Sequence, residues 1–241
     1  VLDVELDSAT LVVQDNESHK RTFIEADCII GADGAFSAIR DKMQKNDRFN
    51  YSQSYIEHGY KELTIPPAPD GDFQLDKNAL HIWPRKQYML IGLPNLDGSF
   101  TCTLFFPFDG NPSFESLKTE AEISAFFNEE FPDVIPFMPT LLQDFAHNPT
   151  SSLVTVRSFP WAYKDKALLI GDAAHAIVPF FGQGMNAGFE DCTVLDECLD
   201  RYPDNWEKAF KEFEILRKPN TDAIAELALE NFIEMRDKVA D

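Results

Sequence analysis

The sequence has 241 residues, 44% of them hydrophobic and 26% charged, which is ordinary for a globular chain of one large or two modest domains. Its net charge of −20 argues against binding to nucleic acid or to an anionic membrane. No apolar run approaches the roughly 18 residues of a membrane span, and no signal peptide opens the chain. The four cysteines form no CxxC pair and the five histidines have no metal-ligand spacing, so we expect free thiols, a cytoplasmic protein and no metal site.

The N-terminal part of the chain shows strand patterns that lead into a helix. Short apolar and alternating stretches predict strands at residues 2–6, 11–13 and 22–24. A further run, Ala26–Ala32, suits a buried strand that ends in a tight turn at Asp33-Gly34. Apolar residues then recur at helical spacing from Phe36 to Met43. This order of a buried strand, a turn and a helix is typical of a nucleotide-binding fold.

The middle of the chain changes character and predicts a separate antiparallel sheet with a helix on it. Asp97-Gly98 supplies a hairpin turn, and Thr119–Glu122 has the pattern of a capping box at a helix start. The predicted strands cover Tyr55–Ile65, Ala79–Trp83, Tyr88–Pro94 and Phe100–Phe106.

Strand and helix patterns return after the middle block. Leu153–Phe159 and Ala167–Ile170 predict strands, and a helix follows from about Gly184 to Pro203. One face of this helix carries Met185, Phe189, Cys192, Leu195, Leu199 and Tyr202. A helix from Trp206 is expected to break before Pro219, after which Asn220-Thr221-Asp222 caps a last one.

The layout predicts a sheet domain inserted into a second, discontinuous domain. We expect the discontinuous domain at residues 1–48 and 159–203, the sheet domain at 49–158 and a helical segment at 204–241.

The first stretch with chemical potential is Cys28–Arg40, CIIGADGAFSAIR. A buried strand delivers Asp33 and Gly34 to its carboxyl end, where α/β folds bind ligands. Ser37 and Arg40 follow, one helical turn apart. A strand, a turn and a capped helix with no ligand would explain the same letters.

The second stretch is Ala167–Asn186, in which ALLIGDAAH is followed by PFFGQGMN. A buried strand again ends in an acid, Asp172, which can bind a sugar hydroxyl. Gly182 and Gly184 then open a helix, whose N-terminal amides favour negative charge. The letters G-x-G-x-x-A at 182–187 are not the pyrophosphate fingerprint, because the preceding strand ends twelve residues earlier, at Ile170.

Together the two stretches resemble the class A flavoprotein aromatic hydroxylases over nearly the whole chain. The resemblance implies an α/β fold: part of a Rossmann-like FAD-binding domain of the para-hydroxybenzoate-hydroxylase type, with an inserted antiparallel-sheet substrate domain and C-terminal helices. It gives Asp33, Gly34 and Arg40 a role near the FAD pyrophosphate and in NADPH handling, and Gly171 and Asp172 a role at the ribityl chain. The residues that border the flavin ring are Pro179, Gly182, Gln183, Gly184, Met185 and Asn186.

Three stretches resemble the branch of this family that hydroxylates L-kynurenine: Leu80–Arg85, Pro179–Cys192 and Glu230–Arg236. The resemblance implies conversion of L-kynurenine to 3-hydroxy-L-kynurenine in tryptophan catabolism, with FAD, NADPH and O₂ and with no catalytic protein nucleophile. It places Phe180, Asn231, Glu234 and Met235 at the substrate, an aromatic amino acid. His175 is interpreted as a structural histidine, and Trp83 and Trp161 as packing residues.

The sequence also departs from the family pattern. It has no GxGxxG directly between a strand and a helix, and it lacks the Arg and Tyr that the family places before the Asp-Gly motif. It ends without the membrane segment of eukaryotic members, as a bacterial member would. We therefore expect an N-terminally truncated chain that is inactive alone. A hydroxylase of phenolic acids and a non-catalytic fragment stay open as alternatives.

Overall fold

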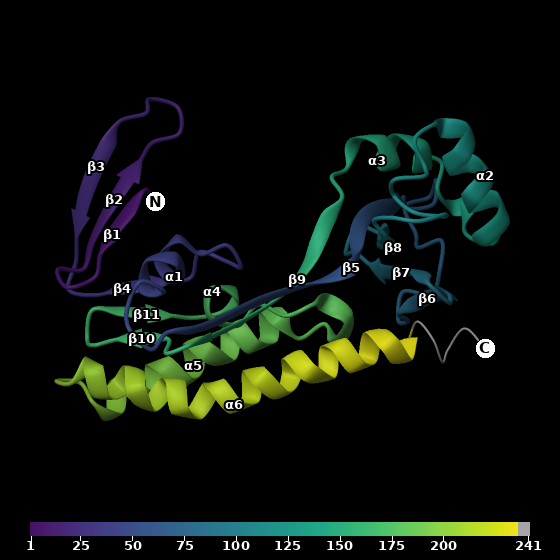
Figure 1. Cartoon of the computed structure of the whole chain (residues 1–241). Helices are drawn as coiled ribbons and strands as arrows, with labels where there is room; N and C mark the ends of the chain where they lie inside the picture. The colour runs from purple at the N-terminus through teal and green to yellow at the C-terminus, as the bar shows by residue number, and fades with distance from the viewer. Residues whose placement is uncertain (236–241) are drawn as a thin grey trace. The chain divides into compact units, whose positions relative to one another are not determined.

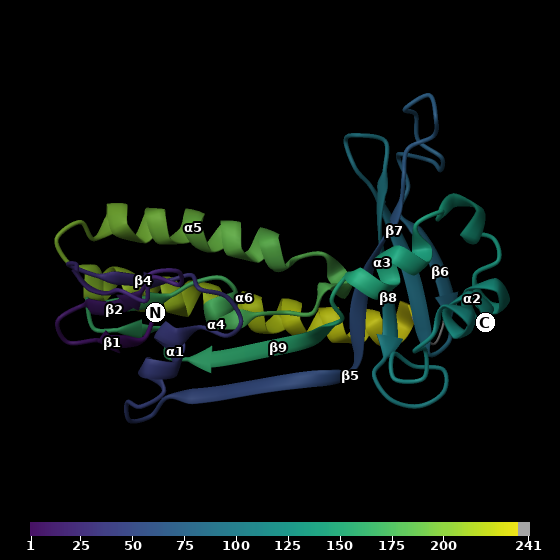
Figure 2. The same cartoon turned by 90° about the horizontal axis from the view of Figure 1, so that it is seen from above.

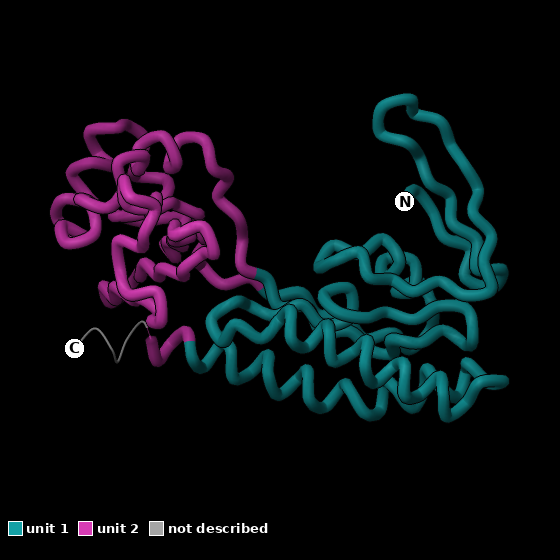
Figure 3. The backbone as a smooth tube through the Cα atoms, turned by 180° about the vertical axis from the view of Figure 1, so that it is seen from behind, with its two compact units in different colours: residues 1–54, 154–231 teal, residues 55–153, 232–241 magenta. Residues whose placement is uncertain are grey.

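The computed structural model describes residues 1–235 and divides the chain into two compact units (Figure 3). Unit 1 comprises residues 1–54 and 154–231, and unit 2 comprises residues 55–153 and 232–241. Each unit has its own cluster of buried apolar side chains.

Unit 1 contains two small three-stranded sheets. The first is antiparallel and consists of β1 (Asp3–Glu5), β2 (Thr10–Gln14) and β3 (Arg21–Glu25). In the second, β4 (Ile29–Gly31) runs parallel to β11 (Ala167–Leu169), which also pairs with β10 (Ala162–Tyr163). The parallel pair brings the ends of the two sequence stretches together, because Gly31 lies opposite Leu169.

The helices of unit 1 bury their apolar faces against this parallel pair. Trp161, Leu168 and Phe213 are fully buried in the shared core. Helices α5 and α6 lie side by side in both views of the ribbon (Figures 1 and 2). The helices are α1 (Ala38–Met43), α4 (Asp172–His175), the 3₁₀ turn η2 (Pro179–Phe181), α5 (Gly184–Arg201) and α6 (Trp206–Ile233).

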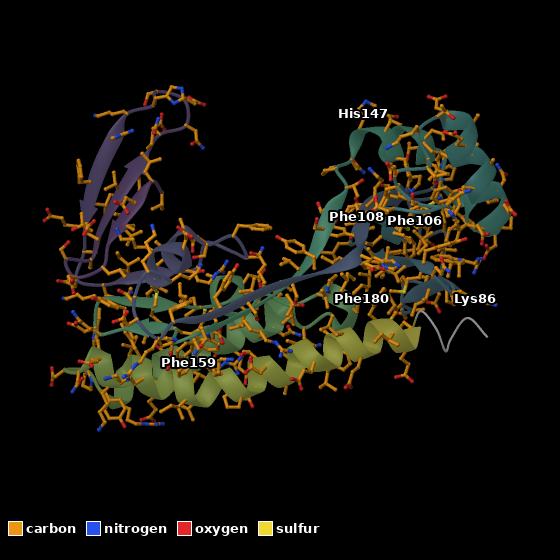
Figure 4. All side chains as sticks on the ribbon, in the orientation of Figure 1. Lys86, Phe106, Phe108, His147, Phe159 and Phe180 are labelled. Carbon is orange, nitrogen blue, oxygen red and sulfur yellow. The ribbon has the colours of Figure 1, made fainter. Side chains whose placement is uncertain are left out.

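Unit 2 contains most of a five-stranded sheet whose order is β6-β7-β8-β5-β9. Aromatic side chains fill its core, and Phe106, labelled in Figure 4, packs edge-on against Tyr88. The strands are β5 (Asn50–Ile65), β6 (His81–Arg85), β7 (Tyr88–Pro94), β8 (Phe100–Pro107) and β9 (Ser151–Phe159). The helical elements are α2 (Glu120–Glu130), η1 (Ile135–Phe137) and α3 (Leu141–His147).

Local sequence signals predicted the elements of unit 2 well. Strand β7 has the predicted bounds, and Gly98 adopts φ +88° in the hairpin turn that follows it. The capping box of α2 is confirmed: the Thr119 side chain accepts from the Glu122 amide, and the Glu122 carboxylate accepts from the Thr119 amide. The sequence patterns did not predict the short helix α3.

The expected break before Pro219 is wrong, because α6 continues through this residue to Ile233. The predicted cap at Asn220-Thr221-Asp222 therefore lies inside the helix. Proline deprives the carbonyl of Ile215, four residues earlier, of its helical donor. Ile215 is 71% exposed, so water can reach this part of the helix surface. Burial of Phe213, Ala225 and other residues on the opposite face favours the continuous helix over the local propensity.

Candidate functional site

A cavity of about 640 Å³ lies in unit 1, within the range usual for ligand sites. It opens beyond the carboxyl ends of the parallel strands β4 and β11, where α/β sheets bind ligands, and beside the N-terminus of α5. Its lining combines small residues with apolar side chains and one carboxylate. The lining residues are Ala32, Gly34, Ile170, Gly171, Asp172, Ile177, Pro179, Gly182, Gly184, Met185, Gly188, Phe189 and Cys192.

Asp33 shapes one wall of the cavity through the turn that it fixes. Its carboxylate accepts hydrogen bonds from the Ser37 hydroxyl at 2.5 Å and from the Ala38 amide at 2.8 Å. Ser37 in turn caps α1 by accepting from the Arg40 amide at 2.9 Å. Asp33 therefore uses its carboxylate within the protein and leaves the backbone of Gly34 at the cavity.

Three glycines expose backbone to the cavity. Gly34, Gly171 and Gly182 have φ values of +84°, +57° and +64°, which residues other than glycine rarely adopt. A Cβ atom on any of the three would meet no heavy atom within 4 Å, so the space in front of each is open. A ligand can therefore approach the main chain closely at these positions.

Asp172 places the one carboxylate on the cavity lining. It follows Gly171 at the start of α4, and its side chain is exposed. Within residues 1–235 it makes no hydrogen bond or ion pair with another side chain or amide. Its two oxygens are thus available to accept hydrogen bonds from ligand hydroxyl groups.

The start of α5 adds positive potential to the same cavity. Gly184 and Met185 line it, and the first amides of a helix have no acceptor within that helix. The partial positive charge at a helix N-terminus favours a ligand group with negative charge. Exposed apolar side chains, Met185 and Phe189, border this polar end and suit the face of a planar ring.

Arg40 lies beside the site but does not line it. Its guanidinium is buried and donates to the Ala173 carbonyl at 2.8 Å and to the Ala35 carbonyl at 2.6 Å. Its carbon Cζ also lies 4.9 Å from the centre of the Tyr51 ring. In this geometry Arg40 joins the turn after β4 to helix α4.

The remaining residues assigned from the sequence are not among the lining residues. Asn186 donates to the Gln183 side chain at 3.0 Å on the first turn of α5. Phe180, labelled in Figure 4, is buried, and its carbonyl accepts a hydrogen bond from the Asn231 side chain at 2.6 Å. Glu234 and Met235 follow the end of α6 and belong to unit 2.

Sequence reasoning missed several residues of the lining. Two of them, Gly188 and Cys192, follow the predicted residue Gly184 at intervals of four, so the three form one stripe along α5. Such a stripe of small residues next to the predicted glycine loop is a signal that could have identified this wall. The other missed lining residues are Ala32, Ile170, Ile177 and Phe189.

The sequence matches the family described as FAD binding domain over residues 3–201. The chain belongs to this family. The matched span contains every residue of the cavity lining, so FAD is the ligand that the family implies for this cavity.

Several relatives share the name "Kynurenine 3-monooxygenase". The chain is 56% identical to "Kynurenine 3-monooxygenase" of Flavobacterium psychrophilum over 241 residues, which is 100% of this chain and 54% of the relative. It is 57% identical to the protein of that name from Flavobacterium johnsoniae, with the same coverage. For the one from Dictyostelium discoideum the identity is 55% over 250 residues, 99% of this chain and 54% of the relative. The chain thus spans about half the length of the curated relatives that it matches.

Solved structures share the fold at low sequence identity. A Klebsiella pneumoniae HpxO variant complexed with FAD matches 98% of this chain and 59% of its own, with a TM-score of 0.75 and 19% identity. Tetrameric 2-methyl-3-hydroxypyridine-5-carboxylic acid oxygenase matches 91% and 57%, with a TM-score of 0.71 and 23% identity. These likenesses confirm the expected class of fold.

Among residues 1–235, none of the helices has the length and apolar character that a membrane span requires.

Proposed function

We propose that this chain is the FAD- and substrate-contacting part of an NADPH-dependent monooxygenase that hydroxylates L-kynurenine to 3-hydroxy-L-kynurenine. The observation that carries the proposal is identity of 55–57% along essentially the whole chain to proteins named kynurenine 3-monooxygenase. Since the chain spans about half of those relatives, the activity belongs to the complete protein that contains these residues.

The cavity fits the cofactor by its chemistry. Bound FAD, reduced by NADPH, supplies the activation of O₂ that aromatic hydroxylation requires. The open backbone at Gly34 and Gly171 admits the phosphate and ribityl part, and Asp172 accepts from its hydroxyl groups. The amides at Gly184 and Met185 face the negative charge of a reduced ring.

The other residues assigned from the sequence have roles in this proposal as well. Asp33 and Arg40 support the cofactor site by holding the Gly34 turn and helix α4. Pro179, Gly182, Gln183 and Asn186 form the loop and first helical turn at the flavin ring. The four residues assigned to the substrate are Phe180, Asn231, Glu234 and Met235.

The two units correspond in this proposal to two tasks. Unit 1 holds the cofactor, and the sheet of unit 2 serves as the substrate domain. The units of the structure change after residues 54, 153 and 231, whereas the sequence pattern places the domain boundaries near residues 48, 158 and 203. The four cysteines are all free, which supports a cytoplasmic location for the protein.

The test uses the complete protein that contains these 241 residues. We expect yellow protein with absorbance near 450 nm, NADPH oxidation that depends on L-kynurenine, and 3-hydroxy-L-kynurenine as the product by mass spectrometry. A phenolic acid such as 4-hydroxybenzoate serves as the comparison substrate. Turnover of the phenolic acid in place of L-kynurenine would replace the proposed substrate, and absence of bound flavin would reject the proposed function altogether.

A further inference from the structure

A carboxylate with no solvent exposure lies behind the cavity, on the inner side of α5. Asp191 accepts hydrogen bonds on Oδ2 from the Gly171 amide at 2.8 Å and from His175 Nε2 at 2.5 Å. Its other oxygen, Oδ1, accepts from Arg217 Nε of α6 at 2.7 Å. One side chain thus joins the end of strand β11, helix α4 and the two long helices of unit 1.

The network holds its charges although it is buried. Burial by itself disfavours the ionised carboxylate, but the bonds from His175, Arg217 and Gly171 outweigh it and lower the pKa of Asp191. Arg217 is 1% exposed and also donates to the Ala187 carbonyl at 3.1 Å. Its Nη1 forms an ion pair with Glu190 at 2.6 Å. The guanidinium therefore contacts three residues of α5, namely Ala187, Glu190 and Asp191.

The Gly171 amide is the point where this network reaches the cavity. Gly171 has φ +57° and ψ −145°, and the next residue is the lining carboxylate, Asp172. Helix α5 packs close behind it, because a Cβ on Gly188 would lie 3.9 Å from Gly171 Cα. Rotation of the peptide before Gly171 would therefore redirect the chain that presents Asp172.

We propose that Asp191, held by Arg217 and His175, is a positioning residue of the cofactor site: its bond to the Gly171 amide sets the direction of Asp172. Asp191 lines no part of the cavity, and its hydrogen bond to the Gly171 amide is its direct link to the lining. The inference rests on the proposed FAD site and names a residue that supports it from the protein interior.

The decisive variant is Asp191→Asn in the complete protein that contains this chain. Asparagine keeps the size of the side chain but cannot accept from Gly171, His175 and Arg217 at once. We expect FAD to bind roughly ten-fold or more weakly by fluorescence titration. In the apoprotein we expect faster hydrogen–deuterium exchange in residues 168–175, a local readout that does not depend on the cofactor.

The matched control is Glu214→Gln, which alters another buried carboxylate of unit 1. Glu214 is 7% exposed, and its Oε2 accepts from the Trp161 and Ala162 amides, neither of which lines the cavity. This variant should leave FAD affinity within about two-fold of the parent, whichever way the midpoint of thermal unfolding shifts. If Asp191→Asn does not fold, Arg217→Lys replaces it, because lysine keeps the charge but loses the fork that holds Asp191.

The outcomes separate the two proposals. A parent protein that binds no FAD would overturn the proposed function, and this inference with it. A parent that binds FAD, together with Asp191 and Arg217 variants that bind it equally well, would overturn this inference alone. Equal weakening by Asp191→Asn and Glu214→Gln would also overturn it, since general destabilisation would then explain the loss.

Discussion

Arg40 Nη1 donates to the carbonyl of Ala173 at 2.8 Å, across a separation of 133 residues. This bond joins the helix after β4 to the helix after β11, so the two halves of unit 1 meet through a buried guanidinium. The cavity opens where the two halves meet, with Gly34 from one and Asp172 from the other. The discontinuous unit therefore forms its site from segments that lie far apart in the sequence.

Asp172 is the side chain whose removal should affect the cofactor most directly. In the complete protein, Asp172→Ala should weaken FAD binding roughly ten- to a hundred-fold, because a charge-assisted hydrogen bond to a hydroxyl group is lost. Fluorescence titration or flavin content after dialysis measures the effect. Asp196→Ala, which removes an exposed carboxylate of α5 outside the cavity lining, is the control. Retention of FAD by both variants to the same extent would remove Asp172 from the site.

Sequence reasoning located the loops of this site because glycines and acids at strand ends are local signals. The strand before Gly34 and the strand before Asp172 were both predicted, and the structure pairs them in parallel. Parallel pairing brings their carboxyl ends to one edge of the sheet. Nothing beyond the order of short motifs was needed for that part of the site.

The interior support of the site could not be predicted in the same way, because it depends on long-range packing. Asp191 shares its buried stripe on α5 with Ala187, Leu195 and Cys198, so it occupies a core position of an amphipathic helix. A charged residue at such a position requires a buried partner, but the sequence does not say which one. Arg217 supplies it from α6, beyond the intervening turn.

Pro219 lies inside helix α6, where the sequence pattern predicted a break, and its effect on stability can be tested. Pro219→Ala should stabilise the protein by roughly 1–3 kcal/mol, because alanine restores a donor for the Ile215 carbonyl and has the higher helix propensity. Urea unfolding of parent and variant gives the difference in the free energy of unfolding. Asn220→Ala, one residue further along the same continuous helix, controls for propensity alone. A loss of stability in Pro219→Ala would mean that the proline itself is needed for packing at this position.

The two buried carboxylates of unit 1 should respond to pH with opposite signs. The pKa of Asp191 lies below its ordinary value of 3.8, so its contribution to stability is present above that pH and is lost as the pH falls through the folded value. Burial raises the pKa of Glu214 above its ordinary value of 4.5, so ionisation costs stability as the pH rises through the folded value.

Urea unfolding between pH 3 and pH 7 would show this difference. Relative to the parent, Asp191→Asn should be most destabilised at pH 7 and less so at pH 3. Glu214→Gln should gain stability relative to the parent as the pH rises over the same range. The same trend with pH in both variants would contradict the assignment.

Gly59 is a position in unit 2 where even one methyl group should be costly. A Cβ there would lie 2.6 Å from Phe108 Cζ and 2.9 Å from the Ser151 carbonyl oxygen. The aromatic ring can shift, but the backbone oxygen cannot, so Gly59→Ala should lower the free energy of unfolding by roughly 1–3 kcal/mol. Gly92→Ala is the matched control on a neighbouring part of the sheet, since its nearest contact would be an ordinary 3.4 Å. Equal stability of the two variants would show that β5 adjusts freely.

Cys192 allows the cofactor position to be probed without any mutation. It is exposed and lines the cavity one helical turn after Gly188. Alkylation by iodoacetamide should therefore proceed in the apoprotein and slow at least several-fold when FAD is bound, because the cofactor covers the sulfur atom. Peptide mapping by mass spectrometry follows the reaction.

Cys28 is an internal reference in the same molecule. It lies outside the cavity lining, and burial raises its pKa to about 11, so it should react slowly with or without FAD. Equal alkylation of Cys192 in the two states would show that the cofactor does not occupy this cavity, and the roles proposed for Asp172 and Asp191 would fail with it.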